Sequence, residues 1–175
     1  IVGGDFFNII KRQDDQMLSI VGDVAGKGIP AALYAAHIQS MFESLSEQCV
    51  SPADIMNGLN QLICRRLREG DFITAVIAFF ESGKNSMTIA RAGHNWPLYY
   101  NAQTHAISSL KPPGVCLGVN MDMGFSACLQ EKTLTINKGD VLLLYSDGVT
   151  EAMNSNNHLF DLTRLESALK ESAHF

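Results

Sequence analysis

The sequence predicts an α+β fold, and three observations support it. Two consecutive helical patterns, residues 30–47 and 52–69, are followed by a long series of short apolar segments typical of strands. The two helices follow each other directly and do not alternate with strands, which argues against a repeated βαβ unit. The length of 175 residues and a hydrophobic content of 46% fit one domain with its own core, residues 1–175.

The N-terminal third contains one clear strand and the two helices. Met17 to Val21 is short and apolar and follows Asp14-Asp15, which we interpret as a solvated turn. Pro30 suits the first turn of a helix, where its missing N–H is not needed. The apolar stripe predicted for this helix is Ala32, Ala35, Ala36, Phe42 and Leu45. Ser51 and Pro52 form a cap and first turn for the second helix, whose apolar residues are Ile55, Leu59, Leu62, Ile63 and Leu67.

The remainder is predicted to be mainly strand. Residues 72–80 are β-branched and aromatic, and a turn at Gly83-Lys84-Asn85 returns the chain into a second strand, residues 87–91. Further strands are predicted at 96–100, 106–110, 125–129, 133–136 and 141–145. Residues 160–172 return to a helical pattern, with Leu162, Leu165 and Leu169 on one side. We interpret Trp96 and the seven methionines as core residues.

Composition excludes several classes of function. A formal charge of −5 disfavours a general nucleic-acid binder, which needs a basic face. No apolar run approaches the ~20 residues that cross a bilayer. The four cysteines have no CxxC spacing and indicate free buried thiols in a reducing cytoplasm. The chain begins at Ile1 without a signal peptide, so we expect a cytoplasmic fragment of a longer protein, which could itself be tethered to a membrane.

Three aspartates stand beside glycines after apolar stretches. They are Asp5 in Gly3-Gly4-Asp5, Asp23 in Gly22-Asp23, and Asp147 in Asp147-Gly148. Mg²⁺ and Mn²⁺ prefer carboxylate, carbonyl and water oxygens, so three such acids predict a hard-cation site. The alternative for each pair taken alone is an ordinary turn, in which Asp beside Gly is common.

The surrounding motifs resemble a known family. The three runs are Val2-Gly3-Gly4-Asp5-Phe6-Phe7, Val21-Gly22-Asp23-Val24-Ala25-Gly26-Lys27-Gly28-Ile29-Pro30 and Leu144-Tyr145-Ser146-Asp147-Gly148-Val149-Thr150-Glu151-Ala152. The supporting segments are Phe72-Ile73-Thr74-Ala75, Arg91-Ala92-Gly93-His94-Asn95, Gly114-Val115-Cys116-Leu117-Gly118 and Lys138-Gly139-Asp140. In this order they resemble the SpoIIE-type, RsbU-like branch of the PP2C or PPM metal-dependent serine/threonine protein phosphatases.

The resemblance implies a fold, a reaction and partners. The fold is a PP2C-like α/β/β/α sandwich of two antiparallel sheets flanked by helices. The reaction is hydrolysis of phosphoserine or phosphothreonine in a regulatory protein, by water activated at a metal centre. The implied substrate is a STAS-type anti-sigma-factor antagonist in a bacterial partner-switching pathway that controls a sigma factor. A sensor domain preceding this chain and a homodimer through the helix pair at 30–69 are also implied.

The resemblance also assigns roles to single residues. Asp23 would bridge two Mn²⁺ or Mg²⁺ ions, the Val24 carbonyl would bind one of them, and Asp147 would bind the other. Asp5 would hold metal-bound water or contact the second ion directly. Asp5, Asp23 and Asp147 are therefore the expected catalytic residues, with no covalent nucleophile and no other cofactor-binding residue.

Other motif residues receive structural interpretations. Asp140 is expected to shape the turn before the strand at 141–145, and His94 to make a turn or a buried hydrogen bond. Lys27 lies near a helix N-terminus, where it would either contact substrate phosphate or remain solvated. Arg65, Arg66 and Arg68 are interpreted as the solvated face of the second helix.

Two alternative functions and one departure from the family pattern also concern these motifs. Gly3-Gly4-Asp5-Phe6 is similar to the GGDEF signature of diguanylate cyclases, but Phe6 stands where that signature needs an acid. A PPM-fold regulatory or dimerisation module with weak catalysis is the other alternative, and the metal ligands distinguish it. The family usually closes with a strand whose acid joins Asp147 at one metal, whereas this chain ends at Ala173-His174-Phe175 and Asp161 is too early to replace it. We therefore expect terminal strands to be missing and one metal site to be incomplete and weak.

Overall fold

The computed structural model describes residues 3–13, 15–49, 51–119 and 124–173. Two compact units are present, and each is built from two separate segments of the chain. Unit 1 comprises Ile1–His94 and Pro112–Thr135, and unit 2 comprises Asn95–Lys111 and Ile136–Phe175. Asp14, expected in a turn, lies outside the described residues, whereas its neighbour Asp15 has a positive φ of 56°, as a tight turn requires.

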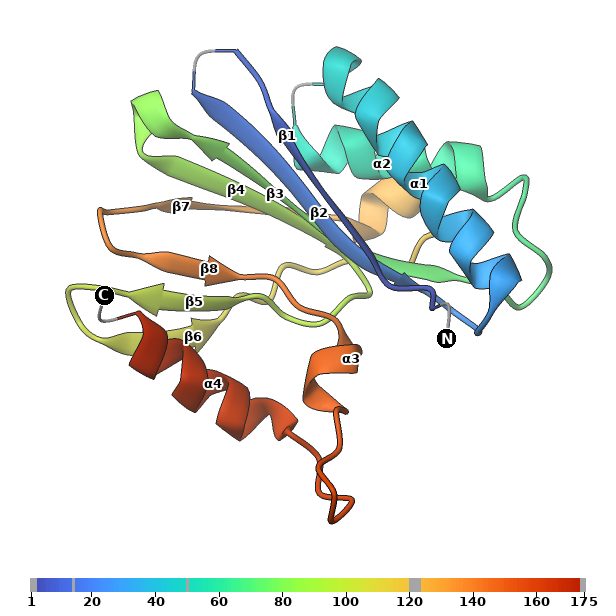
Figure 1. Ribbon diagram of the computed structural model, residues 1–175. Helices are drawn as coiled ribbons and strands as arrows, with labels where there is room; N and C mark the ends of the chain where they lie inside the picture. The colour runs from blue at the N-terminus through green and yellow to red at the C-terminus, as the bar shows by residue number, and fades with distance from the viewer. Residues whose placement is uncertain (1–2, 14, 50, 120–123, 174–175) are drawn as a thin grey trace. The chain divides into compact units, whose positions relative to one another are not determined.

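Unit 1 contains a five-stranded antiparallel sheet (Figure 1). Its strands, in sheet order, are β1 (Phe6–Lys11), β2 (Gln16–Val24), β3 (Ile73–Glu81), β4 (Ser86–Ala92) and β7 (Glu131–Thr135). The predicted hairpin between β3 and β4 is confirmed, with the 3₁₀ turn η1 (Ser82–Lys84) between them. Side chains alternate between the two faces of each strand, so β2 buries Leu18, Ile20 and Val24 on one face.

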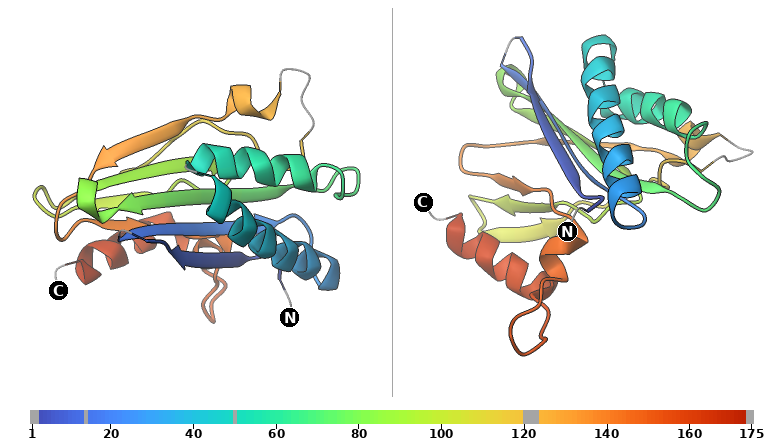
Figure 2. Two further views of the ribbon diagram at one scale, coloured as in Figure 1. Left: turned by 90° about the horizontal axis from the view of Figure 1, so that it is seen from above. Right: turned by 45° about the vertical axis from the view of Figure 1, so that its right-hand side comes forward.

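Two helices, α1 (Ile29–Gln48) and α2 (Pro52–Ile63), cover one face of this sheet (Figures 1 and 2). They meet at Gly58, where a Cβ atom would lie only 2.9 Å from a methyl carbon of Leu45. Ile38 and Phe42 of α1 and Leu59 of α2 are fully buried together with Ile20 and Ile77 of the sheet. The predicted cap of α2 is confirmed, since the Ser51 side chain accepts a hydrogen bond from the Asp54 amide.

The buried stripe of α1 differs from the predicted one. The helix buries Ala31, Ala35, Ile38, Met41, Phe42 and Ser46, whereas Ala36 is exposed and Ala32 only partly buried. Spacings of four, three and four residues follow the 3.6-residue turn, and the predicted pair Ala35-Ala36 could not share one narrow face. Leu33, not included in the prediction, is 67% exposed.

The second helix ends earlier than predicted. α2 stops at Ile63 instead of continuing to residue 69, and the next residues form turns. Leu67 therefore leaves the helix and packs against the unit 1 core beside Gly118, while Leu62 remains exposed. Arg65, Arg66 and Arg68 are exposed, as predicted, but they lie in this turn region and not on a helix face.

Unit 2 contains a three-stranded antiparallel sheet and two helices (Figure 1). The strands in sheet order are β6 (Ala106–Ser109), β5 (Leu98–Asn101) and β8 (Val141–Leu143), and the helices are α3 (Asp147–Thr150) and α4 (Asp161–Ser172). Leu165 and Leu169 of α4 pack against Leu98 and Tyr100 of β5. Leu162, predicted on the same apolar side, is instead exposed.

Three further sequence predictions are wrong. Residues 125–129 form a 3₁₀ turn, η2 (Phe125–Cys128), because the chain enters it through Gly124 at a φ of 79° and buries only Phe125 and Leu129. Trp96 is partly exposed, with the Lys111 ammonium 4.1 Å from its ring centroid, and so is not a core residue. Met17 and Met153 are also exposed. The four cysteines are not paired in disulfides, and they are only partly buried, whereas buried thiols were expected.

Candidate metal centre

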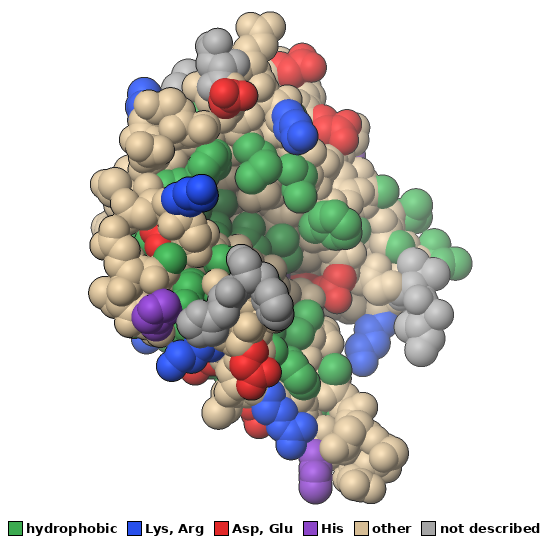
Figure 3. Space-filling model, turned by 60° about the vertical axis from the view of Figure 1, so that its left-hand side comes forward, with side chains coloured by type: hydrophobic (Ala, Val, Ile, Leu, Met, Phe, Trp, Pro, Cys, Tyr) green, Lys and Arg blue, Asp and Glu red, His purple; other side chains and the backbone are tan. Residues whose placement is uncertain are grey.

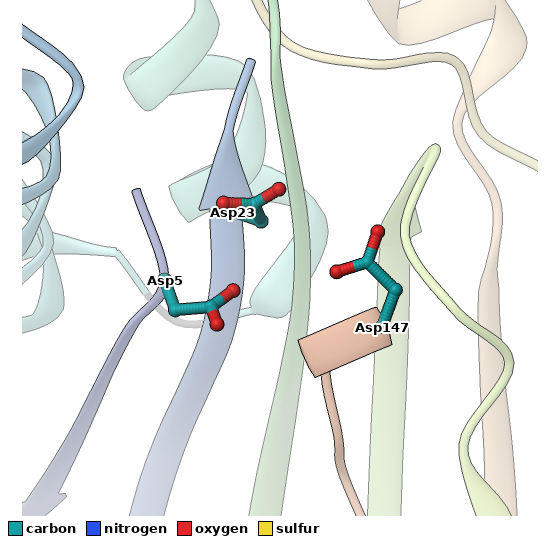
Figure 4. A group of neighbouring side chains, drawn as sticks. All are labelled: Asp5, Asp23 and Asp147. Carbon is teal, nitrogen blue, oxygen red and sulfur yellow. The ribbon is translucent and has the colours of Figure 1, made fainter. Parts of the chain in front are cut away.

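Asp5 and Asp23 lie at the same end of two neighbouring strands. Asp5 immediately precedes β1, and Asp23 is the penultimate residue of β2. The antiparallel register pairs Phe6 with Gly22, so the start of β1 is next to the end of β2. Carboxylate oxygens of the two aspartates lie within 4.8 Å of each other (Figure 4). Two acids so close in an accessible position favour a shared cation, because like charges repel without one.

Gly4 leaves room for two oxygen donors of β2. A Cβ atom at this position would lie 2.4 Å from the Val24 carbonyl oxygen and 2.8 Å from Oδ1 of Asp23. The carbonyl of the same glycine accepts a hydrogen bond from the Val24 amide, 3.3 Å between N and O. The missing side chain therefore allows the carbonyl and the carboxylate to approach the chain segment that carries Asp5. Carboxylate and carbonyl oxygens are the donors that Mg²⁺ and Mn²⁺ prefer, so these residues fit such an ion.

Asp147 belongs to unit 2 and is its first helical residue. It opens α3, a four-residue helix that the sequence did not predict, and it is exposed. Its carbonyl accepts from the Glu151 amide at 2.7 Å, and Figure 4 shows its side chain leaving the start of this helix. Unit 1 thus brings together Asp5, Asp23 and Val24, whereas Asp147 belongs to unit 2.

A series of polar contacts links Asp23 to Arg91 in unit 1. Thr74 of β3 is the register partner of Asp23, and its hydroxyl lies 3.4 Å from the Asp23 carbonyl oxygen and 2.9 Å from Nδ1 of His94. His94 is buried, and its carbonyl accepts from Nη1 of Arg91 at 2.8 Å. Burial lowers the pKa of Arg91, which remains a cation at neutral pH because its ordinary value is so high.

These contacts give a structural role to two of the motif segments, residues 72–75 and 91–95. The buried hydrogen bond expected of His94 is present, with Thr74 as its partner. The sequence pattern assigned Thr74 no role, although it lies in the Phe72-Ile73-Thr74-Ala75 segment. The signal that could have identified Thr74 is its hydroxyl in an otherwise apolar strand. A hydroxyl in a buried strand needs a hydrogen-bond partner.

Asp140 shapes a turn in unit 2, as expected. Its carboxylate accepts hydrogen bonds from the Tyr99 hydroxyl, from the Ala102 amide at 2.8 Å and from the Asn137 amide at 2.8 Å. Burial raises the pKa of Asp140, but these hydrogen bonds outweigh it and hold the pKa below its ordinary value. Both oxygens of the Asp140 carboxylate therefore accept hydrogen bonds within unit 2.

The remaining candidates have no contact that indicates a ligand. Lys27 is exposed in the loop between Gly26 and Gly28, both of which have positive φ. Asp161 begins α4, where its Oδ1 accepts from the Arg164 amide at 3.0 Å. This contact uses one oxygen of the Asp161 carboxylate to cap the first turn of α4.

The surface carries no continuous basic region on the face drawn in Figure 3, where acidic and basic side chains are interspersed with polar and hydrophobic ones. None of the helices within the described ranges combines the length and the apolar composition that a membrane span requires.

Comparison with known proteins identifies the fold and the family. The family model for stage II sporulation protein E (SpoIIE) matches residues 13–174. Phosphoserine phosphatase RsbU of Bacillus subtilis is 32% identical over 158 residues, which cover 90% of this chain and 46% of RsbU. The chain spans less than half the length of the curated relatives it matches.

Two solved structures share the fold at low sequence identity. The RsbU and RsbW domains of a Mycobacterium tuberculosis protein align with a TM-score of 0.81 at 20% identity, over 98% of this chain and 46% of that one. The SiaA-PP2C domain of Pseudomonas aeruginosa aligns with a TM-score of 0.79 at 20% identity, over 97% of this chain and 66% of that one. The predicted PP2C-like fold of antiparallel sheets and flanking helices is confirmed, and the chain belongs to the SpoIIE family of PP2C-type domains.

Proposed function

We propose that this chain is a metal-dependent protein phosphatase that hydrolyses phosphoserine or phosphothreonine in a regulatory protein. The observation that carries the proposal is the pair Asp5 and Asp23, whose carboxylates lie within 4.8 Å of each other beside a glycine that leaves space for the Val24 carbonyl. Membership of the SpoIIE family and the relationship to a phosphoserine phosphatase support it.

The residues would act mainly by position and charge. Asp23 would bridge two divalent ions, Val24 would contribute its carbonyl to one of them, and Asp147 would bind the other. Asp5 would bind the second ion directly or through water. When bound, Mn²⁺ or Mg²⁺ would supply neutralising charge for the phosphate and lower the pKa of water, so that water can act as nucleophile near neutral pH.

The protein around these ligands has two tasks. The paired strand ends of β1 and β2 fix Asp5 and Asp23 on a sheet, which positions ligands more accurately than loops do. Thr74 and His94 hold the strand segment that carries Asp23 from the side of β3. Positioning of this kind contributes to rate because reacting groups are held close and correctly oriented.

The partners belong to the same proposal. A phosphorylated STAS-domain protein is the proposed substrate, within a partner-switching pathway that regulates a sigma factor. The relatives named RsbU and RsbP, both phosphoserine phosphatases of Bacillus subtilis, support a role in signalling of this kind. Association of two copies through the helix pair α1 and α2 is proposed as the regulatory interface.

One experiment separates this function from a catalytically weak regulatory module. The full chain is incubated with a phosphoserine protein in the presence of Mn²⁺ or Mg²⁺, and released phosphate is measured with and without EDTA. We expect turnover that EDTA abolishes and added metal restores. Undiminished turnover in excess chelator would contradict the metal mechanism, and no turnover at saturating metal would favour the regulatory module.

A further inference from the structure

Unit 2 displays two large apolar side chains on an ordered hairpin between α3 and α4. Every residue from Glu151 to Leu159 is exposed, yet backbone hydrogen bonds close the segment. The Phe160 amide donates to the Ala152 carbonyl at 2.7 Å, and the Asn154 amide donates to the His158 carbonyl at 3.0 Å. Oδ1 of Asn154 accepts from the Asn156 and His158 amides, which fixes the tip.

The hairpin brings Met153 and Leu159 side by side. They form an antiparallel bridge, and residues paired in this way point to the same face. Met153 is 65% exposed and Leu159 is 44% exposed. Single exposed apolar residues are common, but two that are held together by a closed backbone and surrounded by polar residues are typical of an interaction site.

The composition of the hairpin fits a protein partner. Residues 152–160 contain no Asp, Glu, Lys or Arg, and the polar residues among them are asparagines, a serine and a histidine. Interfaces have an apolar centre from which charged residues are depleted, with hydrogen-bonding groups around it. Met153 and Leu159 would form this centre, and the Asn-rich tip would form its polar rim.

The position of the hairpin in the chain indicates which partner it meets. Asp147 begins α3, and Met153 follows it by only six residues. Six residues span at most about 20 Å even when fully extended. A protein interface of standard size, about 800 Å² per partner, is roughly 30 Å across. A folded protein whose phosphoserine is held near Asp147 therefore has a footprint wide enough to include both Asp147 and the hairpin.

From these observations we propose that Met153 and Leu159 form a docking surface for the folded phosphoprotein substrate, beside its phosphorylated residue. The inference rests on the proposed function, because it takes Asp147 as a ligand of the catalytic centre. A second copy of the chain is the less suitable occupant, since two apolar side chains supply far less area than a stable dimer buries. For a bound substrate the two side chains need to supply only part of the interface, because the phosphorylated residue held near Asp147 supplies another part.

The test compares three substrates with the full chain. The first is a phosphorylated STAS-domain protein, the second is a short phosphopeptide with the sequence of its phosphorylated site, and the third is p-nitrophenyl phosphate. The double variant Met153→Gln/Leu159→Gln removes the apolar surface. The matched controls are Ser155→Gln, which changes the polar tip, and Met153→Leu/Leu159→Met, which keeps the surface apolar.

We expect the double variant to raise KM for the phosphoprotein about ten-fold with little change in kcat, a loss typical of an interface anchor. Turnover of the phosphopeptide and of p-nitrophenyl phosphate should stay within about two-fold, because neither reaches the hairpin. Both controls should behave like the unmodified chain. An equal loss on all three substrates would overturn the inference in favour of structural support, and no loss on any would overturn it as well.

Two further measurements distinguish substrate docking from self-association and from failure of the proposed function. If the variant changes the mass of the protein in solution and affects all substrates alike, the occupant is a second copy and the inference is wrong. If the unmodified chain hydrolyses none of the three substrates, the proposed function fails. Binding of the fluorescently labelled phosphoprotein, measured by anisotropy, then decides the docking surface separately, since the double variant should still weaken it about ten-fold.

Discussion

Asp23 is the residue on which the proposed chemistry depends most. Asp23→Asn keeps the shape of the side chain and removes the charge that would bridge two ions, so we expect activity to fall by at least about 100-fold with the fold retained. Phosphate release at saturating Mn²⁺ measures the loss, and circular dichroism monitors the fold. Asp161→Asn is the matched control, because it removes a carboxylate charge but keeps the oxygen that accepts from Arg164. Near-normal rates for Asp23→Asn would contradict the bridging role.

Gly4 and Gly3 provide a test that does not depend on turnover. In Gly4→Ala the new methyl group would meet the Val24 carbonyl and the Asp23 carboxylate, so both proposed donors must move. At Gly3 the nearest atom to such a methyl group is 3.9 Å away, and Gly3→Ala should be harmless. We expect calorimetric titration with Mn²⁺ to show affinity at least about ten-fold weaker for Gly4→Ala only. Equal affinity in the two variants would exclude the proposed arrangement of donors.

Asp140 predicts how stability responds to acid. Its folded pKa is lower than its unfolded pKa, so its contribution is present above the ordinary value near 3.9 and is lost as pH falls below it. Asp140→Asn cannot carry the charge that the Tyr99 hydroxyl and two amides stabilise, and we expect a loss of about 1 kcal/mol at pH 7. Urea unfolding at pH 7 and pH 3 measures this loss. The difference between variant and unmodified chain should shrink at pH 3, and a constant difference would count against the assignment.

At the scale of elements, the exposed face of α1 carries the proposed regulation. Ile29 and Leu33 are exposed large apolar residues on the first half of the helix, which follows Val24 by only a short loop. We expect Leu33→Gln to weaken self-association while the circular dichroism of the folded chain stays unchanged. Ala35→Leu fills a buried position instead and should destabilise the fold by about 1–3 kcal/mol. Sedimentation measures the association of both variants, and urea unfolding measures the stability of Ala35→Leu. Unchanged association in Leu33→Gln would contradict an α1 interface.

The same elements show what could be predicted from sequence. Short apolar and β-branched runs beside turn residues identified β2, β3 and β4, and the Ser51-Pro52 signal identified the start of α2. Phe125 and Leu129 were misassigned to a strand because two apolar residues four apart suit either a strand or a turn that buries both. α3 was missed because four residues are too few for any periodicity.

The candidate site was predicted unevenly for a physical reason. Asp5, Asp23 and Asp147 could be selected because carboxylates beside glycines follow apolar stretches. The space that Gly4 leaves beside the Val24 carbonyl and the pairing of Thr74 with Asp23 could not be predicted. Both depend on the register between strands. Register is set by pairing between distant segments, and single-sequence patterns do not contain it.

At the scale of the whole molecule, the two units could not be recognised in the sequence either. Unit 2 joins residues 95–111 to residues 136–175 through the pairing of β5 with β8, so its segments are separated by a stretch that belongs to unit 1. Composition does not change at these boundaries, so the sequence contains no signal for them, and one domain over residues 1–175 stays a prediction. Asp5 and Asp23 belong to unit 1 and Asp147 belongs to unit 2, so the effect of metal on stability has to be measured on the full chain.

This yields a last prediction that is independent of any substrate. A ligand that binds only the folded state stabilises it by RT ln(1 + [L]/Kd), which is about 2.7 kcal/mol when the metal concentration is 100 times Kd. We expect the melting temperature of the full chain to rise with Mn²⁺ concentration and to fall back with EDTA. Asp147→Asn should reduce this rise although the residue is exposed and its replacement costs little stability without metal. Cys116→Ser, at a thiol with no proposed role, should leave the rise unchanged. If Asp147→Asn and the unmodified chain gained the same stability at every Mn²⁺ concentration, Asp147 would have to be removed from the proposed ligands, whereas Asp5 and Asp23 would remain.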